Sequence, residues 1–336
     1  MGHSTQSNSL IFFPSRPLLI SWSSIPDMTH RLTFSAIAKQ FGRQTALHPL
    51  TLSLEPGEIL GFLGPNGAGK TTAIHLALGF LRPSSGTGSL LGKPFGDAEA
   101  RSRLGFVPDV PVFFSESGFR SVELAARLNG VDDPRLAKDI RDLLSAVGLA
   151  NDRKDSRQFS RGMQQRLALA QALINDPELL ILDEPAAALD PAGVQQVREL
   201  LRNARQAGKS IFFSSHQLTE VELICDRIAF LNQGRLVRCG SLKEFQSESD
   251  RVEIEVRGLA LAEVSGISSS ATAGPASIRL TVPAQQQRRV IEAVWNAGGE
   301  IVSFAPLRRR LEELFLEWSA DGAAQHPAAE GERSSP

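Results

Sequence analysis

The feature that most constrains this chain is a glycine-rich run between an apolar stretch and a stretch with the pattern of a helix. The run is Gly64-Pro65-Asn66-Gly67-Ala68-Gly69-Lys70-Thr71-Thr72. Residues 59–63 before it are apolar and predict a short buried strand, and residues 73–78 after it predict the start of a helix. A strand, a glycine-rich loop, a Lys-Thr pair and a helix in this order predict a loop that binds phosphate.

Each part of this run has a physical role in holding a polyphosphate. Glycines let the backbone approach the anion, because they lack a Cβ and tolerate positive φ. The free N–H groups and the dipole at the start of the helix attract negative charge. Lys70 adds a cation for the β- and γ-phosphates, and the hydroxyl of Thr71 is a ligand that Mg²⁺ accepts. The simpler alternative is a glycine-rich turn with a solvated lysine, but the flanking strand and helix favour the phosphate loop.

Length and composition limit the class of protein. A chain of 336 residues is expected to form about two domains, and 42% hydrophobic with 22% charged residues is typical of a globular chain. The net charge of −1 gives no support for a nucleic-acid partner. Cys225 and Cys239 indicate a reducing compartment and have no neighbours at metal-ligand spacing. No stretch reaches the roughly 20 apolar residues of a membrane span, so work at a membrane would need another chain that crosses it.

Patterns along the chain predict its domains and elements. The expected parts are a disordered N-terminal extension (1–30), an α/β domain (31–245) with a helix-rich segment at about 110–175, a polar linker (246–250), a small α+β domain (251–319) and a disordered tail (320–336). Strands are expected at 32–41, 50–54, 59–63, 103–107, 179–182, 210–214, 227–232, 235–237, 252–256 and 278–282. Helices are expected from 73 to near 81–83 and at 162–174, 194–207, 217–225, 285–297 and 307–318.

Two further stretches carry chemistry. Asp183 and Glu184 end a hydrophobic strand, where adjacent side chains diverge, so Asp183 can hold Mg²⁺ through water while Glu184 polarises an attacking water. An acidic pair that caps a helix is the alternative. Ser160 and Gly162 open a predicted helix and form a second potential anion site, with an ordinary N-cap as the alternative. The phosphate loop in the same chain favours the functional interpretation of both stretches.

These motifs resemble those of the ATP-binding cassette (ABC) ATPases, in that family's order, over about residues 32–242. The matching stretches are the Walker A loop (64–72), the signature sequence (159–166), Walker B with its catalytic glutamate (179–184), the D-loop (187–190) and the switch histidine, His216. Phe41 lies where the family places the aromatic ring that stacks on adenine. The sequence departs from the family at Met163, where glutamine is common in the signature, and at Asp109, which takes the place of the Q-loop glutamine.

The resemblance implies a fold and a function. The fold is an α/β P-loop NTPase of the ABC type, with a RecA-like core and mixed sheet, an antiparallel β subdomain and a helical subdomain, followed by a small C-terminal α+β domain. The function is that of a transporter subunit that binds and hydrolyses ATP with Mg²⁺. The implied catalytic residues are Lys70, Glu184 and His216; the metal ligands are Thr71, Asp183 and Asp109; and the nucleotide contacts are residues 64–72, Phe41, Ser160 and Gly162.

The resemblance also implies partners. In the family, one ATP lies between the Walker A loop of one subunit and the signature helix of another, so a homodimer is the simplest expectation and a paralogous partner an alternative. A separate integral membrane permease is expected, which places the chain in the cytoplasm on the face of the cell membrane. Residues 311–317 are similar to the appendage of drug, antibiotic and polysaccharide exporters, which favours export.

Two other functions remain open at this point. A soluble ABC ATPase acting on ribosomes or nucleic acid usually has two cassettes or coiled-coil inserts and basic surfaces, so one cassette and a near-neutral charge argue against it. A regulatory module that does not hydrolyse ATP is disfavoured because Glu184 is present.

Overall fold

The computed structural model describes residues 30–150, 154–246, 248–261, 263, 271–274, 277–308 and 311–324. They form two compact units. The first contains the described residues up to Gly240, together with those from Asp321 onwards, and the second contains those from Ser241 to Ala320. This division lies upstream of the boundary predicted at residue 245. Residues 1–29 of the predicted extension and residues 325–336 of the predicted tail lie outside the described residues. Within the described part of the chain, no helix is long and apolar enough to span a membrane.

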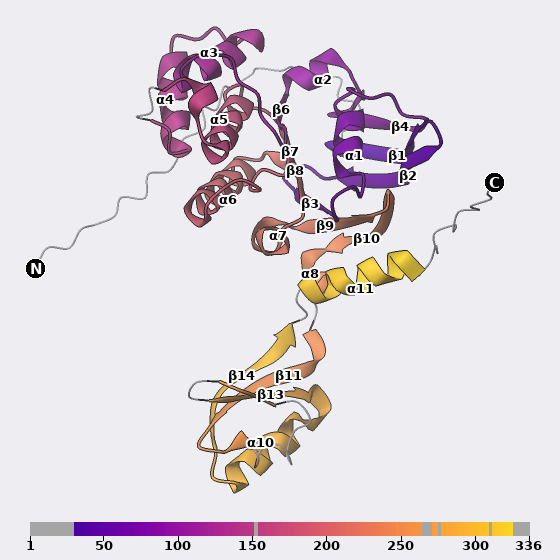
Figure 1. Ribbon diagram of the computed structural model, residues 1–336, viewed down its shortest axis with the longest axis vertical. Coiled ribbons are helices and arrows are strands. Elements are labelled where there is room, and N and C mark those ends of the chain that lie inside the picture. Colours follow the sequence, from indigo (N-terminus) through magenta and orange to yellow (C-terminus); the bar gives the residue numbers. More distant parts are fainter. Residues whose placement is uncertain are drawn as a thin grey trace, which may run out of the picture. The chain divides into compact units, whose positions relative to one another are not determined.

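The first unit is built on a six-stranded sheet (Figure 1) with the strand order β10-β9-β3-β8-β7-β6. The strands are β3 (Ile59–Leu63), β6 (Leu104–Val107), β7 (Leu179–Asp183), β8 (Ser210–Ser215), β9 (Arg227–Asn232) and β10 (Arg235–Ser241). β3 pairs in parallel with β8 and β9, and β7 pairs in parallel with β6 and β8. Every residue of β3, β7 and β8 is buried, as expected for parallel strands covered on both faces. Because these strands are parallel, the residues after them meet at one edge of the sheet.

A second, antiparallel sheet packs beside the first. Its order is β2-β1-β4-β5, with β1 (Leu32–Phe41), β2 (Gln44–Leu54), β4 (Ser85–Leu90) and β5 (Lys93–Pro94). Helix α1 (Lys70–Ala77) contributes to the apolar core that the two sheets share. In that core the ring centroid of Phe212 lies 5.1 Å from that of Phe62 and 6.3 Å from that of Phe34. The contact between Phe34 of β1 and Phe212 of β8 joins the antiparallel sheet to the central one.

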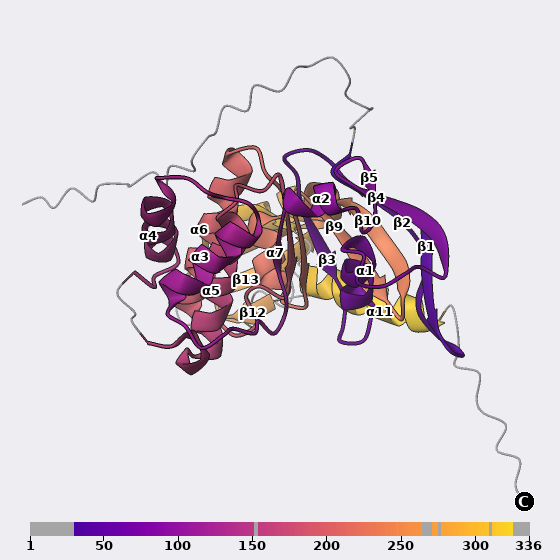
Figure 2. The same ribbon diagram turned by 90° about the horizontal axis from the view of Figure 1, so that it is seen from above.

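The other helices of the first unit gather on the opposite side of the central sheet. They include α3 (Gly118–Leu128), α4 (Leu136–Ala146), α5 (Arg161–Leu173), α6 (Pro191–Gln206) and α7 (Leu218–Ile224), while α2 (Ala98–Ser102) precedes β6 and the 3₁₀ turn η1 (Ser156–Gln158) precedes α5. Figure 2 shows α3, α4 and α5 together on this side, with α1 and the antiparallel sheet on the other. Ser160 begins α5 by accepting a hydrogen bond from the backbone N–H of Met163, as predicted for an N-cap.

The second unit has a four-stranded sheet of its own. Its order is β12-β13-β11-β14, with β11 (Glu248–Arg257), β12 (Ala271–Ala273), β13 (Ile278–Pro283) and β14 (Glu300–Arg308). The unit also contains α8 (Leu242–Phe245), η2 (Ala284–Gln286) and α10 (Gln287–Asn296), and α11 (Leu311–Ala324) begins in it. Val290 and Val294 of α10 pack on the inward-facing valine, isoleucine and leucine side chains of β11 and β13. The alternation of residues 252–256 and 278–282 predicted both strands.

Several element predictions are wrong in this region and near α1. Residues 248–250, predicted as linker, belong to β11, because backbone pairing with β14 does not depend on polar composition. The helix predicted from residue 307 begins at Leu311, since residues 307 and 308 complete β14, which was not predicted. Residues 320–324, predicted to be disordered, extend α11. Helix α1 ends at Ala77 rather than near residue 81.

An ion-pair cluster at the other edge of the central sheet gives a test of pH dependence. Oε2 of Glu178 lies 2.9 Å from Arg31, and Oε1 accepts a hydrogen bond of 2.7 Å from Arg103. Burial raises the pKa of Glu178, but the hydrogen bond and charge of Arg103, with the charges of Arg31 and Lys209, outweigh it and hold that pKa below the ordinary 4.5. The stabilisation is therefore complete above pH 4.5 and is lost as the pH falls through the lower folded-state pKa.

We expect Glu178→Gln to lower the free energy of unfolding of the first unit at pH 7, because the variant loses the charge that pairs with Arg31 and Arg103. The loss should be only about 1 kcal/mol, since solvent screens this partly exposed carboxylate. The difference from the wild type should shrink as the pH falls below 4.5. Urea titrations at pH 7 and below pH 4.5 measure both effects. Glu99→Gln, which breaks an exposed ion pair with Lys93, is the control and should change little. A deficit in the Glu178 variant that is equal at both pH values would contradict the assignment.

Candidate functional site

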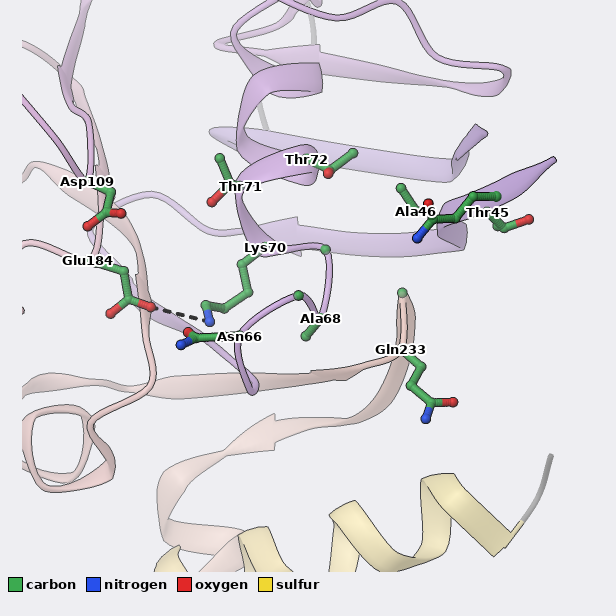
Figure 3. A pocket seen from close by; sticks show the side chains of 14 residues that line it. Thr45, Ala46, Asn66, Ala68, Lys70, Thr71, Thr72, Asp109, Glu184 and Gln233 are labelled. Atoms are coloured by element: carbon green, nitrogen blue, oxygen red, sulfur yellow. Dashed lines mark ion pairs between the residues drawn. The ribbon is translucent and has the colours of Figure 1, made fainter. Parts of the chain in front are cut away.

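A cavity of about 450 Å³ opens at the carboxyl edge of the central sheet, around the glycine-rich loop. Its lining residues are Gln44, Thr45, Ala46, Asn66, Gly67, Ala68, Gly69, Lys70, Thr71, Thr72, Asp109, Glu184, Gln233 and Gly234. Figure 3 shows Asp109, Glu184 and Thr71 on one side of this cavity, and Thr45, Ala46 and Gln233 on the other. The predicted phosphate loop and two of the predicted acidic residues are therefore brought together.

The shape of the loop depends on glycine at two positions. A Cβ at Gly64 would lie 2.2 Å from the carbonyl oxygen of Leu231, which no side chain tolerates. Gly69, immediately before α1, has a φ of +101°, and a Cβ there would lie 2.7 Å from the carbonyl oxygen of Ala46. The loop is thus pressed against β9 and β2, and its backbone turns directly into the N-terminus of α1.

Lys70 is the first residue of α1, and its side chain is held inside the loop. Its Nζ donates hydrogen bonds to the carbonyl oxygens of Gly64, at 2.7 Å, and Pro65, at 3.4 Å. The same ammonium lies 3.3 Å from Oε1 of Glu184 (Figure 3). Lys70 is only 6% exposed, and a buried ammonium without partners would be costly. The cavity therefore contains a fixed cation at the start of a helix, which favours an anionic ligand.

Glu184 follows β7 directly and is held by the switch-histidine candidate. Its φ of +50° is in the left-handed region, which is unfavourable for a residue with a Cβ and is often found at functional sites. Oε2 lies 2.8 Å from Nδ1 of His216 and accepts the backbone N–H of His216 at 3.3 Å. A carboxylate only accepts hydrogen bonds, so Nδ1 carries the hydrogen in this pair. His216 therefore contacts Glu184, which lines the cavity, but does not line the cavity itself.

Asp183, the last residue of β7, is next to Glu184 in the chain. It is 2% exposed, is not part of the lining, and its Oδ1 accepts a hydrogen bond of 2.5 Å from the hydroxyl of Ser214. Thr71 and Asp109 do line the cavity and contribute a hydroxyl and a carboxylate to its wall. Hard oxygen ligands of this kind suit Mg²⁺. Among the described residues there is no group of three or more His, Cys, Asp and Glu side chains that could hold a metal ion by itself. Thr71 and Asp109 are the cavity residues whose oxygen atoms such a cation would accept as ligands.

The comparisons with known proteins identify the family. A model of the ABC transporter family matches residues 47–187. An uncharacterised ABC transporter ATP-binding protein of Nostoc sp. is 40% identical over 275 residues, which cover 81% of this chain and 82% of the relative. The chain belongs to the ABC transporter ATP-binding proteins. It is accordingly the ATP-binding subunit of an ABC transporter and an ATP hydrolase, as the resemblance implied.

Other relatives agree with this assignment. The daunorubicin resistance ATP-binding protein of Streptomyces coeruleorubidus is 32% identical over 311 residues, which cover 89% of this chain and 98% of the relative. A solved ATP-binding subunit of an ABC transporter has a TM-score of 0.60 at 28% identity and covers 64% of this chain and 91% of that one. A dimeric ATP-binding cassette bound to ADP and phosphate has a TM-score of 0.58 at 24% identity, covering 63% and 98%, and this likeness supports the fold alone. The predicted ABC-type P-loop fold is confirmed.

Some of the predicted ABC ATPase site residues do not line the cavity, although Phe41 is paired with Gln44, which does. Phe41, the proposed adenine-stacking residue, ends β1 with 48% of its surface exposed, and the Lys39 ammonium lies 4.9 Å from its ring centroid. Ser160 and Gly162, the proposed signature contacts, begin α5 outside the cavity. Gly162 packs on the D-loop, since a Cβ there would lie 3.0 Å from the carbonyl oxygen of Ala188. The roles of these residues stay predictions.

The far wall of the cavity in this ABC ATPase was not predicted from the sequence. That wall consists of Gln44, Thr45 and Ala46 of β2 with Gln233 and Gly234 of the β9–β10 turn. Gly234 donates its N–H to the carbonyl oxygen of Ala68 and accepts the N–H of His48. The strands predicted at 227–232 and 235–237 imply a turn between them, but its place beside the loop follows from sheet packing and has no signal in the motif.

Proposed function

We propose that this subunit hydrolyses ATP with Mg²⁺ as one half of a homodimer, and that it drives export through a separate membrane subunit from the cytoplasmic face of the membrane. The observation that carries the proposal is the contact of Lys70, Glu184 and His216 beside the phosphate loop. A cation can bind phosphate and a carboxylate can accept the proton of a water, while the histidine holds that carboxylate, so the three groups suit ATP hydrolysis.

Each of these residues has a task in the reaction. Lys70 exchanges its ion pair with Glu184 for the β- and γ-phosphate oxygens. Glu184, released by Lys70 and still held by His216, accepts the proton of a water whose oxygen bonds to the γ-phosphorus. The bond from that phosphorus to the bridging oxygen breaks, which gives ADP and phosphate. The loop N–H groups and Lys70 stabilise the negative charge on the phosphate oxygens.

Mg²⁺ is supported by the ligands that the cavity offers. The hydroxyl of Thr71 and the carboxylate of Asp109 would hold it, and Asp183 would act through water. When bound, the ion supplies positive charge that neutralises phosphate oxygens. Asp109 provides a charge here that the family's glutamine would not, so it is expected to strengthen the hold on the cation.

The homodimer is supported by the separation of two anion sites in one chain. The phosphate loop opens into the cavity, while Ser160 at the start of α5 lies outside it. A two-fold pairing would let the α5 N-terminus of one subunit complete the cavity of the other.

The membrane subunit is supported by an exposed loop that starts at the cavity. Asp109 lines the cavity, and the next residues lead to α3 in the helical part. In this loop Val112 is 89% exposed and Phe114 75%, and Val110 is exposed too, so three apolar side chains face solvent within five residues. Exposed apolar groups that cluster in this way mark contact surfaces. A movement of Asp109 would pass along this loop to the partner.

Export is supported by the name of a relative, the Nod factor export ATP-binding protein I of Cupriavidus metallidurans, which is 36% identical over 237 residues. The bacitracin transport ATP-binding protein of Bacillus licheniformis, which is 37% identical over 206 residues, supports transport.

The test is affinity purification of the Glu184→Gln variant from gently solubilised membranes with ATP and Mg²⁺, followed by mass spectrometry. A multi-span membrane protein should be recovered in near-equal amount. Adding Val112→Ser and Phe114→Ser should remove that protein while ATP affinity, measured by calorimetry, stays within about twofold, because the exposed loop residues do not line the cavity.

Leu223→Ser is the matched control, since this exposed leucine lies on α7 rather than in the loop. It should leave the membrane protein bound. Recovery of ribosomal or nucleic-acid partners, with the chain in the soluble fraction, would overturn the transporter assignment. If the double serine variant retains the membrane protein, only the proposed role of the loop is overturned, and the transporter assignment stands.

A further inference from the structure

Ser214 lies between the two acidic residues at the end of β7. It is fully buried in β8 and pairs with Asp183 across the parallel strands. Its hydroxyl donates a hydrogen bond of 2.5 Å to Oδ1 of Asp183 and accepts the backbone N–H of Glu184 at 3.0 Å. One hydroxyl therefore contacts both residues.

The direction of these two hydrogen bonds is fixed. A carboxylate can only accept, so the hydroxyl hydrogen of Ser214 points to Asp183. Its lone pairs are then left for the part-buried N–H of Glu184, which uses this hydroxyl as its acceptor. Alanine at this position would remove both bonds, and the N–H of Glu184 would lose its acceptor.

The hydrogen bond from Ser214 is made to the backbone N–H of Glu184, a residue whose backbone is strained. The φ of +50° at Glu184 is a conformation that a residue with a Cβ adopts only when its surroundings hold it there. That conformation carries the carboxylate to Lys70, at 3.3 Å, and to His216, at 2.8 Å. Relaxing it would turn the carboxylate away from the cavity, because φ sets the direction of the Cα–Cβ bond.

We propose that Ser214 is a positioning residue for hydrolysis: its hydroxyl, fixed by Asp183, holds the backbone of Glu184 in the left-handed conformation that aims the carboxylate at the attacking water. The inference rests on the proposed catalytic role of Glu184. Ser214 does not line the cavity, so it acts through Glu184 rather than on the nucleotide.

The test compares two buried serines of the same strand in the full-length chain. Ser214→Ala should lower kcat about tenfold or more and leave the dissociation constant of ATP within about twofold, since binding uses the loop and Lys70. Ser210→Ala is the matched control: its hydroxyl is equally buried and also makes two hydrogen bonds, to Gly57 and Glu55, at the opposite end of β8. It should lower the melting temperature as much as Ser214→Ala and leave kcat unchanged.

Two further variants separate this inference from the proposed function. Ser214→Thr keeps the hydroxyl and should recover most of kcat. In a Glu184→Gln background, measured by single turnover, Ser214→Ala should have no additional effect, because it acts through Glu184. If Glu184→Gln turns over normally, the proposed role of Glu184 fails. If Glu184→Gln is inactive but Ser214→Ala and Ser210→Ala have the same kcat, the positioning role of Ser214 is wrong.

Discussion

The Glu184→Gln variant is expected to bind ATP normally, to lose turnover by about a hundredfold or more, and to accumulate as an ATP-bound dimer. Glutamine has the same shape, but its amide cannot take a proton from water. The change also removes the negative charge that neutralises Lys70 at 3.3 Å, so the phosphate meets a free cation and ATP binding is retained. Without hydrolysis, the negative charge of the γ-phosphate stays between the loop of one subunit and the α5 N-terminus of the other, so the proposed dimer does not open.

Turnover is measured by phosphate release, and the dimer by size-exclusion chromatography with and without ATP. Glu58→Gln is the matched control, because Glu58 is also buried and ion-paired, to Arg227 at 3.0 Å, but precedes β3 at the end away from the cavity. It should lower stability and leave kcat unchanged. A Glu184→Gln protein that stays monomeric when loaded with ATP would count against the proposed dimer.

The Lys70→Ala variant is expected to weaken ATP binding by about a hundredfold, which corresponds to about 3 kcal/mol for a charged hydrogen bond in a buried site. Two effects add in the same direction. The phosphate loses its cation, and the Glu184 carboxylate, now without its ion pair, repels the anion. Isothermal calorimetry with ATP measures the loss.

Lys93→Ala serves as the comparison, since Lys93 pairs with Glu99 on the antiparallel sheet and does not line the cavity. Its affinity for ATP should match that of the wild type. An unchanged dissociation constant in Lys70→Ala would remove Lys70 from the proposed binding site, whatever its effect on kcat.

The sequence predicted those parts of the site that follow directly after buried strands. The ends of β3, β7 and β8 are marked by apolar runs, and parallel pairing brings the loop, Glu184 and His216 to one edge. The far wall could not be predicted, because Thr45 and Ala46 reach the cavity through the packing of one sheet on another. Strand β14 was missed for a related reason: its pairing with β11 joins residues far apart in the chain.

The close contact between the loop and the neighbouring segments has a consequence for how the first unit responds to its ligand. Carbonyl oxygens of Ala46 and Leu231 leave no room for a Cβ at Gly69 and Gly64, and Gly234 bonds to Ala68. A nucleotide in the cavity would touch the antiparallel sheet, the loop and the β9–β10 turn at once. Binding would therefore link these three segments more tightly into one cooperative unfolding unit, so that slow hydrogen exchange would spread from the central strands into β2.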